Sequence, residues 1–161
     1  MKRLIMKKAY AFTGPSNSGK TTLICKISEY LQSLNLKVAI IKHDPKDKAI
    51  FDINTKDSYK FYSTGASVAV ISPKRTTFFH NESLEFDEIL KRFDADIILV
   101  EGLKTLPLPR LCVFCKEVDE SYLEFSDAIA TYSKKDYKIT HFNLDDIKAI
   151  SEFIITNAKE I

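Results

Sequence analysis

Hydrophobic and polar positions follow two patterns that alternate along the chain. Short apolar runs, typical of buried strands, are separated by segments whose apolar residues recur at helical spacing. The helical pattern is clearest from about Gly19 to Leu34, where one face carries Leu23, Ile27, Tyr30, Leu31 and Leu34. Strands that alternate with helices are typical of α/β proteins. We therefore expect a mostly parallel central sheet flanked by helices.

The same patterns predict where each element lies. Strands are expected over residues 8–13, 37–42, 67–71, 76–79, 96–100, 111–115, 128–132 and about 138–141. Helices are expected over about 19–34, 56–63, 84–93 and 144–158. The strand at 76–79 is a candidate for antiparallel pairing. The chain shows no repeat or linker, so a single domain over residues 1–161 is predicted.

Charge and hydropathy exclude two classes of partner. The formal net charge is +2 and the lysines are spread among acids, so nothing indicates a nucleic-acid surface or an anionic membrane as partner. The apolar runs are far shorter than the ~18 residues of a membrane span. Lys7 and Lys8 interrupt the N-terminal apolar run, unlike a signal peptide. A cytoplasmic location is expected.

Three cysteines, Cys25, Cys112 and Cys115, cannot form a closed set of disulfides and fit a reducing compartment. The spacing of Cys112 and Cys115 matches a metal or redox pair. Their run LCVFC is apolar, however, and no second pair accompanies it, so a buried strand is the better interpretation.

The stretch GPSNSGKT lies between the first predicted strand and the first predicted helix. Strand, G-x-x-x-x-G-K-[ST] and helix in this order are typical of a phosphate-binding loop, in which backbone N–H groups surround an anion at a helix N-terminus. Lys20 would reach the terminal phosphates, and the Thr21 hydroxyl would coordinate Mg²⁺. The predicted phosphate site comprises Gly14, Pro15, Ser16, Asn17, Ser18, Gly19, Lys20 and Thr21. The motif favours a three-layer fold of the P-loop NTPase type.

A nucleotide site of this kind needs an acid at the end of a neighbouring strand. Glu101 follows four apolar residues and supplies it, either as a water-mediated Mg²⁺ ligand or by positioning the attacking water. The alternative is an exposed carboxylate at a strand end. Lys20 and Glu101 are therefore the candidate catalytic residues.

The polar stretch HDPKDKAIFDINTKDS follows the second predicted strand, where ligands bind in open α/β folds. Lys42 or His43 could contact a phosphate or a second substrate. The carboxylates Asp44, Asp47 and Asp52 could contact the metal, and Asp52 is included in the predicted metal set. For each of these side chains taken singly, a solvated position is the alternative, and we expect one or two of them to be functional.

Base selectivity has a weaker signal. Guanine-selective folds carry Asn-Lys-x-Asp after a strand, and this chain reads Ser133-Lys134-Lys135-Asp136 there. Asp136 is therefore a candidate base reader, and a plain turn is the alternative. His80 and His141 have no partners at metal-ligand spacing.

Several motifs together resemble one known family, the molybdopterin-guanine dinucleotide biosynthesis protein B (MobB) family. They are GPSNSGKTTL (14–23), KHDPKDKAIFD (42–52), KDSYKFYSTGA (56–66), VEGLK (100–104) and PRL (109–111). The chain departs from many members at Pro45-Lys46, where some have His-His, and at Thr55, where many have Gly.

The resemblance implies a homodimeric GTP-binding protein with weak GTPase activity. Such a protein assists a MobA-type nucleotidyltransferase as GMP is attached to molybdopterin during maturation of the molybdenum cofactor. By motif match, residues 14–22, which add Thr22 to the loop, would bind the phosphates and Mg²⁺. Glu101 and Gly102 would form the metal-side motif.

Two other functions stay open from the sequence. One is an ATP-dependent small-molecule kinase, although none of Arg3, Arg75, Arg92 and Arg110 lies in an obvious lid segment. The other is a binding module whose nucleotide sets the conformation of residues 44–58 and thereby partner affinity. The aromatic segment 75–79 is a candidate for dimer pairing, with core packing as its alternative.

Overall fold

The structure is a computed structural model that describes residues 6–161, so Arg3 lies outside the described residues. Contacts divide the chain into two compact units. The first contains the residues up to His43 and those from Asp94 onwards, and the second contains residues Asp44–Phe93. Whether residues 1–161 fold as a single domain is a separate question from how their contacts are divided. The single domain therefore stays a prediction.

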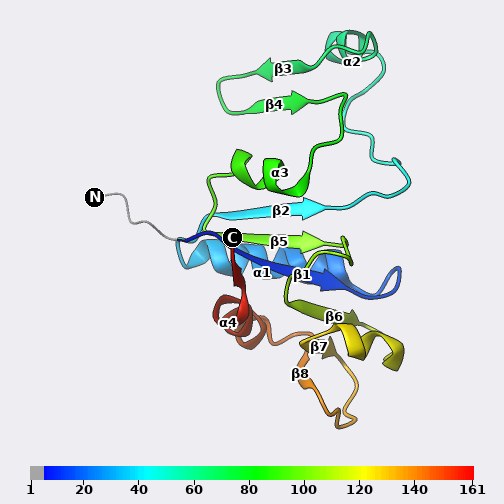
Figure 1. Ribbon diagram of the computed structural model, residues 1–161, viewed down its shortest axis with the longest axis vertical. Helices are drawn as coiled ribbons and strands as arrows, with labels where there is room; N and C mark the ends of the chain where they lie inside the picture. The colour runs from blue at the N-terminus through cyan, green and yellow to red at the C-terminus, as the bar shows by residue number, and fades with distance from the viewer. Residues whose placement is uncertain (1–5) are drawn as a thin grey trace. The chain divides into compact units, whose positions relative to one another are not determined.

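The first unit is built on a sheet of seven strands among the described residues (Figure 1). These are β1 (Lys8–Thr13), β2 (Val38–Lys42), β5 (Ile97–Glu101), β6 (Arg110–Phe114), β7 (Ala128–Thr131), β8 (Thr140–Asn143) and β9 (Lys159–Glu160). Their order is β2-β5-β1-β6-β7-β8, with every neighbouring pair parallel. The short β9 pairs antiparallel with the start of β1. The mostly parallel sheet predicted from the alternating patterns is confirmed.

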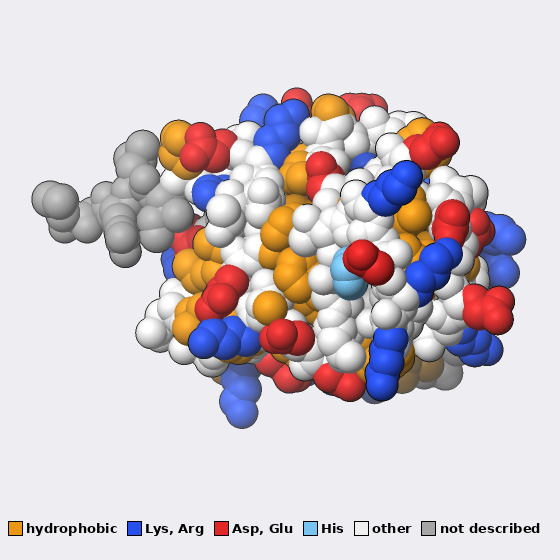
Figure 2. All heavy atoms as spheres, turned by 90° about the horizontal axis from the view of Figure 1, so that it is seen from below, with side chains coloured by type: hydrophobic (Ala, Val, Ile, Leu, Met, Phe, Trp, Pro, Cys, Tyr) orange, Lys and Arg blue, Asp and Glu red, His pale blue; other side chains and the backbone are white. Residues whose placement is uncertain are grey.

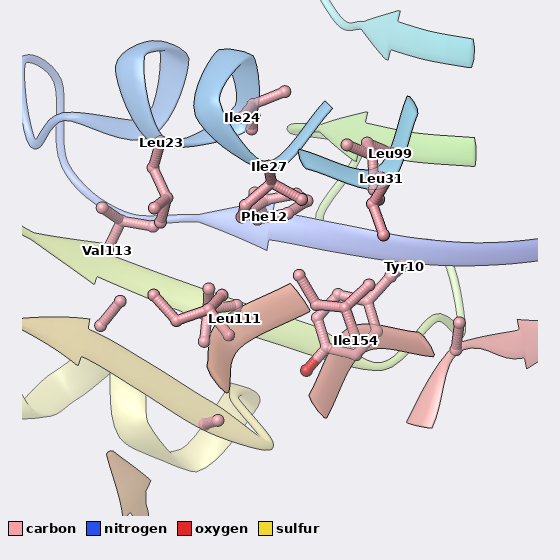
Figure 3. Close-up of a cluster of buried hydrophobic side chains, with 14 of the residues drawn as sticks. Tyr10, Phe12, Leu23, Ile24, Ile27, Leu31, Leu99, Leu111, Val113 and Ile154 are labelled. Atoms are coloured by element: carbon pink, nitrogen blue, oxygen red, sulfur yellow. The ribbon is translucent and has the colours of Figure 1, made fainter. Parts of the chain in front are cut away.

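Helices α1 (Lys20–Ser33) and α4 (Ile147–Asn157) cover one face of this sheet. Figure 3 shows Tyr10 and Phe12 of β1 among side chains of α1, including Ile27, and Ile154 of α4. Each of these side chains is fully buried, and burial of one large apolar side chain stabilises a fold by roughly 1.5–3 kcal/mol. Helix α4 begins later than the predicted residue 144 because the Asp146 side chain caps it, accepting from the N–H of Ala149 at 3.1 Å.

The opposite face of β6 and β7 is covered by the 3₁₀ helix η1 (Glu120–Phe125). Cys112, Phe114 and Ile129 are buried there against Tyr122 and neighbouring apolar residues. Helix η1 was not predicted, because six residues are too few to show a helical period. Strand β9, which has only two residues, was not predicted either.

The second unit contains a two-stranded sheet and two short helices. Its elements are α2 (Asp57–Tyr62), β3 (Val68–Ile71), β4 (Thr76–Phe79) and α3 (Phe86–Arg92). Strands β3 and β4 pair antiparallel, with Val68 opposite Phe79, which confirms the antiparallel pairing. Glu85 and Glu88 form a capping box at the start of α3.

Basic and acidic side chains are interspersed on the face of the molecule drawn in Figure 2. This arrangement agrees with the small net charge of +2. No helix within residues 6–161 is long and apolar enough to cross a membrane.

Candidate functional site

The loop after β1 is held in a conformation that requires glycine. Gly14 has φ 135° and Gly19 has φ 90°, and Asn17 between them is also left-handed at φ 59°. A Cβ atom at Gly14 would lie 2.6 Å from the carbonyl oxygen of Val113 in β6, well inside van der Waals contact. The two glycines of the motif are therefore needed for the backbone to curl against the neighbouring strand.

The start of helix α1 faces this loop with unpaired backbone donors. Its N-cap residue is Gly19, which provides no side-chain cap. The first helical hydrogen bond runs from the N–H of Leu23 to the carbonyl oxygen of Gly19, at 3.0 Å. Within the described residues, the N–H groups just before Leu23 are thus available to an anion, and the helix dipole favours negative charge there.

Lys20 is folded back over the loop. Its Nζ donates to the carbonyl oxygens of Pro15 at 2.7 Å and Gly14 at 3.0 Å, and to Ser18 Oγ at 3.3 Å. Burial lowers the pKa of Lys20, and the nearby charge of Glu101 opposes this effect. The ammonium group thus lies at the centre of the loop, where a terminal phosphate would be bound.

Glu101 ends β5, which lies between β1 and β2 in the sheet. In register, Glu101 lies beside Phe12 on one strand and Lys42 on the other. Its carboxylate is only 13% exposed and forms an ion pair with Lys42, with 3.1 Å between Nζ and Oε1. The sheet therefore brings Glu101 to the same edge as the phosphate loop, as predicted.

Gly102 and His43 lie directly beside this ion pair. The N–H of Gly102 donates to the carbonyl oxygen of Phe12, and the N–H of His43 donates to that of Glu101. Gly102 has φ 90°, and a Cβ there would lie 3.0 Å from His43 Cβ. The glycine after Glu101 is thus needed for the close approach of the β2 and β5 ends.

The oxygen donors present suit Mg²⁺ bound together with a nucleotide. Thr21 is exposed at the start of α1, and Glu101 is at the adjacent strand end. No group of three or more His, Cys, Asp or Glu side chains that could hold a metal occurs within residues 6–161. Nucleotide-bound Mg²⁺ needs only one or two protein ligands because phosphates and waters supply the rest, so the donor set fits.

Asp52 belongs to the second unit, and its role as a metal ligand stays a prediction. Its Oδ1 accepts from the N–H of Ile53 at 2.8 Å. Asp44 accepts from the N–H groups of Lys48 and Ala49, both at 2.7 Å, and orders the turn in which Asp47 has φ 48°. In this unit the loop carboxylates therefore bind their own backbone.

Two cavities lie where the nucleoside of a bound nucleotide is expected. One, of about 190 Å³, lies between Gly19 and Thr22 on one side and Cys115 and Tyr132 on the other. The second, of about 970 Å³, continues from Tyr132 along Ser133, Lys135 and Tyr137. Tyr132, directly after β7, lines both cavities, and together they are the candidate nucleotide groove.

Asp136 does not line this groove, although its two neighbours do. Lys135 lies 5.6 Å from the Tyr137 ring centre and forms an ion pair with Glu120 at 2.6 Å. Tyr132 and Tyr137 were not predicted. Tyr132, an aromatic residue directly after a strand that ends at the ligand edge, was the signal that could have found this region. Asp136 as base reader stays a prediction.

The cysteines, His80 and His141 form no metal cluster among the described residues. Cys112 is buried in β6, whereas Cys115 follows the strand on the opposite face. The two thiols therefore do not form a metal or redox pair. His141 Nδ1 lies 3.3 Å from the carbonyl oxygen of Ile139, and His80 contacts Arg92 within the second unit.

Comparison with known proteins was made by family, by sequence and by fold. The family model of molybdopterin guanine dinucleotide synthesis protein B (MobB) matches residues 9–134. The molybdopterin-guanine dinucleotide biosynthesis adapter protein of Haemophilus influenzae is 28% identical over 151 residues, 88% of this chain and 84% of its own. The adapter protein of the same name from Escherichia coli is 25% identical over 158 residues, 90% of each chain.

Solved structures agree with this assignment. A crystal structure of molybdopterin-guanine biosynthesis protein B has a TM-score of 0.75 at 28% identity, over 92% of this chain and 98% of that one. Bacillus subtilis MobB has a TM-score of 0.71 at 22% identity, over 94% and 98%, and supports the fold alone. Because the family model covers more than half of the chain, this protein belongs to the molybdopterin guanine dinucleotide synthesis protein B family.

Proposed function

We propose that this protein is a GTP-binding adapter in the biosynthesis of molybdopterin guanine dinucleotide. Its relatives in H. influenzae and E. coli are named as adapter proteins of that biosynthesis. Nucleotide binding is supported above all by the position of Lys20. Its ammonium group lies within a loop whose glycines have positive φ, at a helix N-terminus without a side-chain cap. This arrangement suits the phosphates of a nucleotide.

In this proposal residues 14–22 bind the phosphates, and Lys20 moves its donors from loop carbonyls to phosphate oxygens. Thr21 and Glu101 hold Mg²⁺, which when bound neutralises phosphate charge. Glu101 also orients a water molecule for hydrolysis. No arginine of the described first unit other than the buried Arg110 is available to stabilise the transition state, so hydrolysis is slow.

The partner side of the proposal is a MobA-type nucleotidyltransferase, with the adapter acting as a homodimer. The hairpin of β3 and β4 is the candidate dimer surface because Ile71 and Phe78 are largely exposed on it. An isolated two-stranded hairpin is marginally stable in water, and an apolar partner surface would stabilise it.

Calorimetric titration of the purified protein with GTP and with ATP, each in Mg²⁺, tests the proposal. We expect GTP to bind more tightly than ATP and Lys20→Ala to lose at least about tenfold in affinity, because a charged hydrogen bond to phosphate is worth roughly 1.5–3 kcal/mol. Lys148→Ala is the matched control, since Lys148 lies on α4 and forms an ion pair with Glu152, at 3.9 Å.

The outcomes separate the candidate functions. Unchanged GTP binding in Lys20→Ala would sink the phosphate-loop assignment. A clear preference for ATP would instead favour the small-molecule kinase. GTP binding that changes affinity for the nucleotidyltransferase without changing its turnover would favour the pure binding module.

A further inference from the structure

A separate cavity of about 440 Å³ lies in the first unit, on the face of the sheet opposite α1. Its walls come from the end of β1 at Thr13, from Lys104 and Arg110, and from Tyr122 and Phe125 of η1. Phe12 of β1 faces α1, so the next side chain, Thr13, points to the other face. The cavity and the nucleotide groove, which runs along Tyr132, share no lining residue.

Arg110 provides this cavity with a buried positive charge. Its side chain is 5% exposed, and its Nη2 donates to the carbonyl oxygen of Leu106 at 3.0 Å. Its Nη1 is buried and has no hydrogen-bond partner among residues 6–161. Burial lowers the pKa of Arg110. Because Nη1 has almost no accessible surface, Arg110 contributes the charge of its guanidinium to the cavity wall and not an open donor.

The nearest acid does not neutralise Arg110 directly. Asp127 Oδ2 accepts from the backbone N–H of Arg110, at 2.6 Å, and forms no ion pair within 4 Å with its guanidinium in the described residues. Its charge still raises the pKa of Arg110, though less than burial lowers it. The positive charge of Arg110 is therefore not neutralised by an ion pair within the described residues.

Lys104 and two aromatic rings complete the cavity. Lys104 Nζ lies 5.0 Å from the Tyr122 ring centre, and the Tyr122 ring is held edge-on against Phe114, with centroids 5.9 Å apart. Phe125 at the rim is 72% exposed, which is unusual for a phenylalanine beside a formed cavity. Two cations beside two rings match a ligand that has an oxyanion and a planar apolar part.

We propose that this cavity is a second ligand site, which binds a phosphomonoester attached to a planar ring. The phosphate lies between Arg110 and Lys104, because a doubly charged oxyanion with several acceptors suits two cations better than a carboxylate does. The ring packs against Tyr122 and Phe125. The volume is within the usual range for small-molecule sites. The site does not depend on what the phosphate loop binds.

Titration with 1-naphthyl phosphate, followed by its fluorescence, tests the proposal. We expect binding that persists in Lys20→Ala, because the phosphate loop is not involved. Lys104→Met and Arg110→Met should each weaken it about 10- to 100-fold, as expected for loss of a positive charge beside the phosphate. Lys138→Met, an exposed lysine that lines none of the three cavities described here, is the matched control.

Three results would overturn the proposal: no binding to the wild-type protein at millimolar probe, binding abolished by Lys20→Ala, or equally tight binding of 1-naphthoate. Either of the first two results would mean that the probe does not bind in this cavity. The third would mean that the site accepts any aromatic acid and does not select a phosphomonoester. Lys104 is exposed, so Lys104→Met decides the question if Arg110→Met does not fold. GTP titration of the same variants separates this result from a failure of the proposed nucleotide function.

Discussion

Two buried polar side chains in the first unit, Tyr10 and Arg110, lie in different surroundings. Tyr10 is fully buried in the core beneath α1 and α4, and its hydroxyl has no hydrogen-bond partner within residues 6–161. Arg110 has an unpartnered donor too, but it lines a cavity. The tyrosine hydroxyl only weakens the core, whereas the arginine charge can act on a ligand in that cavity.

Replacing Tyr10 with Phe should not destabilise the protein. Removal of an unsatisfied buried hydroxyl is expected to raise the free energy of unfolding by up to about 1 kcal/mol, as measured by urea denaturation at pH 7. Tyr10→Ala, which leaves a cavity, should lower it by roughly 3–5 kcal/mol. A loss of more than about 1 kcal/mol in Tyr10→Phe would show that the hydroxyl has a partner.

The same variant should alter stability in alkali. Burial, helped by the charge of Asp127, raises the pKa of Tyr10, so the folded protein holds this proton more tightly than the unfolded chain. The associated stability is present below the unfolded pKa of ~10 and is lost as pH rises beyond it, by roughly 1.4 kcal/mol per pH unit. Tyr10→Phe should show a shallower decline above pH 10, and equal slopes would contradict this.

The thiols should differ sharply in reactivity. Burial raises the pKa of the Cys112 thiol to about 11, whereas Cys25 is exposed and Cys115 is partly exposed. Because the thiolate is the reactive form, Cys112 should be protected at pH 8. Titration with an aromatic disulfide reagent should therefore modify Cys25 and Cys115 in the native protein, and Cys112 only after denaturation. Rapid native modification of Cys112 would be incompatible with its burial.

Among the elements, the loop between β1 and α1 has the tightest conformational requirement. Gly14 combines a left-handed φ with a close approach to the Val113 carbonyl oxygen, at 2.6 Å for an added Cβ. Gly65 has a similar φ of 91°, but an added Cβ there would meet nothing within 4 Å. Alanine at Gly65 would therefore introduce backbone strain alone, whereas alanine at Gly14 would add steric overlap to it.

Gly14→Ala should abolish measurable nucleotide binding and lower the melting temperature more than Gly65→Ala does. Strain alone at a left-handed position costs about 1–2 kcal/mol, and overlap with a backbone carbonyl adds to it because the strand must move. Thermal denaturation and GTP titration of both variants measure the difference. Similar losses in the two variants would show that the β1–β6 contact has no special importance.

In the whole molecule, the two units differ in how completely their apolar side chains are covered. The first unit buries nearly all the inward side chains of its sheet, whereas the second leaves large side chains exposed, among them Ile50, Phe51, Ile71 and Phe78. Exposed apolar residues on a small hairpin unit are typical of a surface that another chain covers.

Phe78→Lys should convert a dimer to a soluble monomer in light scattering. Phe78 is 67% exposed on β4. If the hairpins of two protomers pack together, a lysine at this position would bury an unpaired charge, which is unfavourable. Leu34→Lys, at an exposed apolar position after α1 in the first unit, is the control and should leave the mass unchanged. A dimer that survives Phe78→Lys would reject the hairpin as the interface.

Much of the fold was predictable from local pattern. The strands and long helices were identified because their apolar spacing reflects burial directly, and the phosphate loop because its glycines and lysine have no other common use in that context. Helix η1 was not predictable, since a six-residue 3₁₀ helix is stabilised by contacts with β6 and not by its own period.

The sequence alone predicted the element types and the phosphate loop and showed the resemblance to the MobB family, because each depends on residues close together in the chain. The pairing of Glu101 with Lys42, the groove along Tyr132 and the cavity at Arg110 required the folded chain. Their residues come from different strands, and parallel strands meet at one edge only after every crossover has formed. Local pattern therefore identifies elements, while the order of strands in the sheet determines which side chains meet.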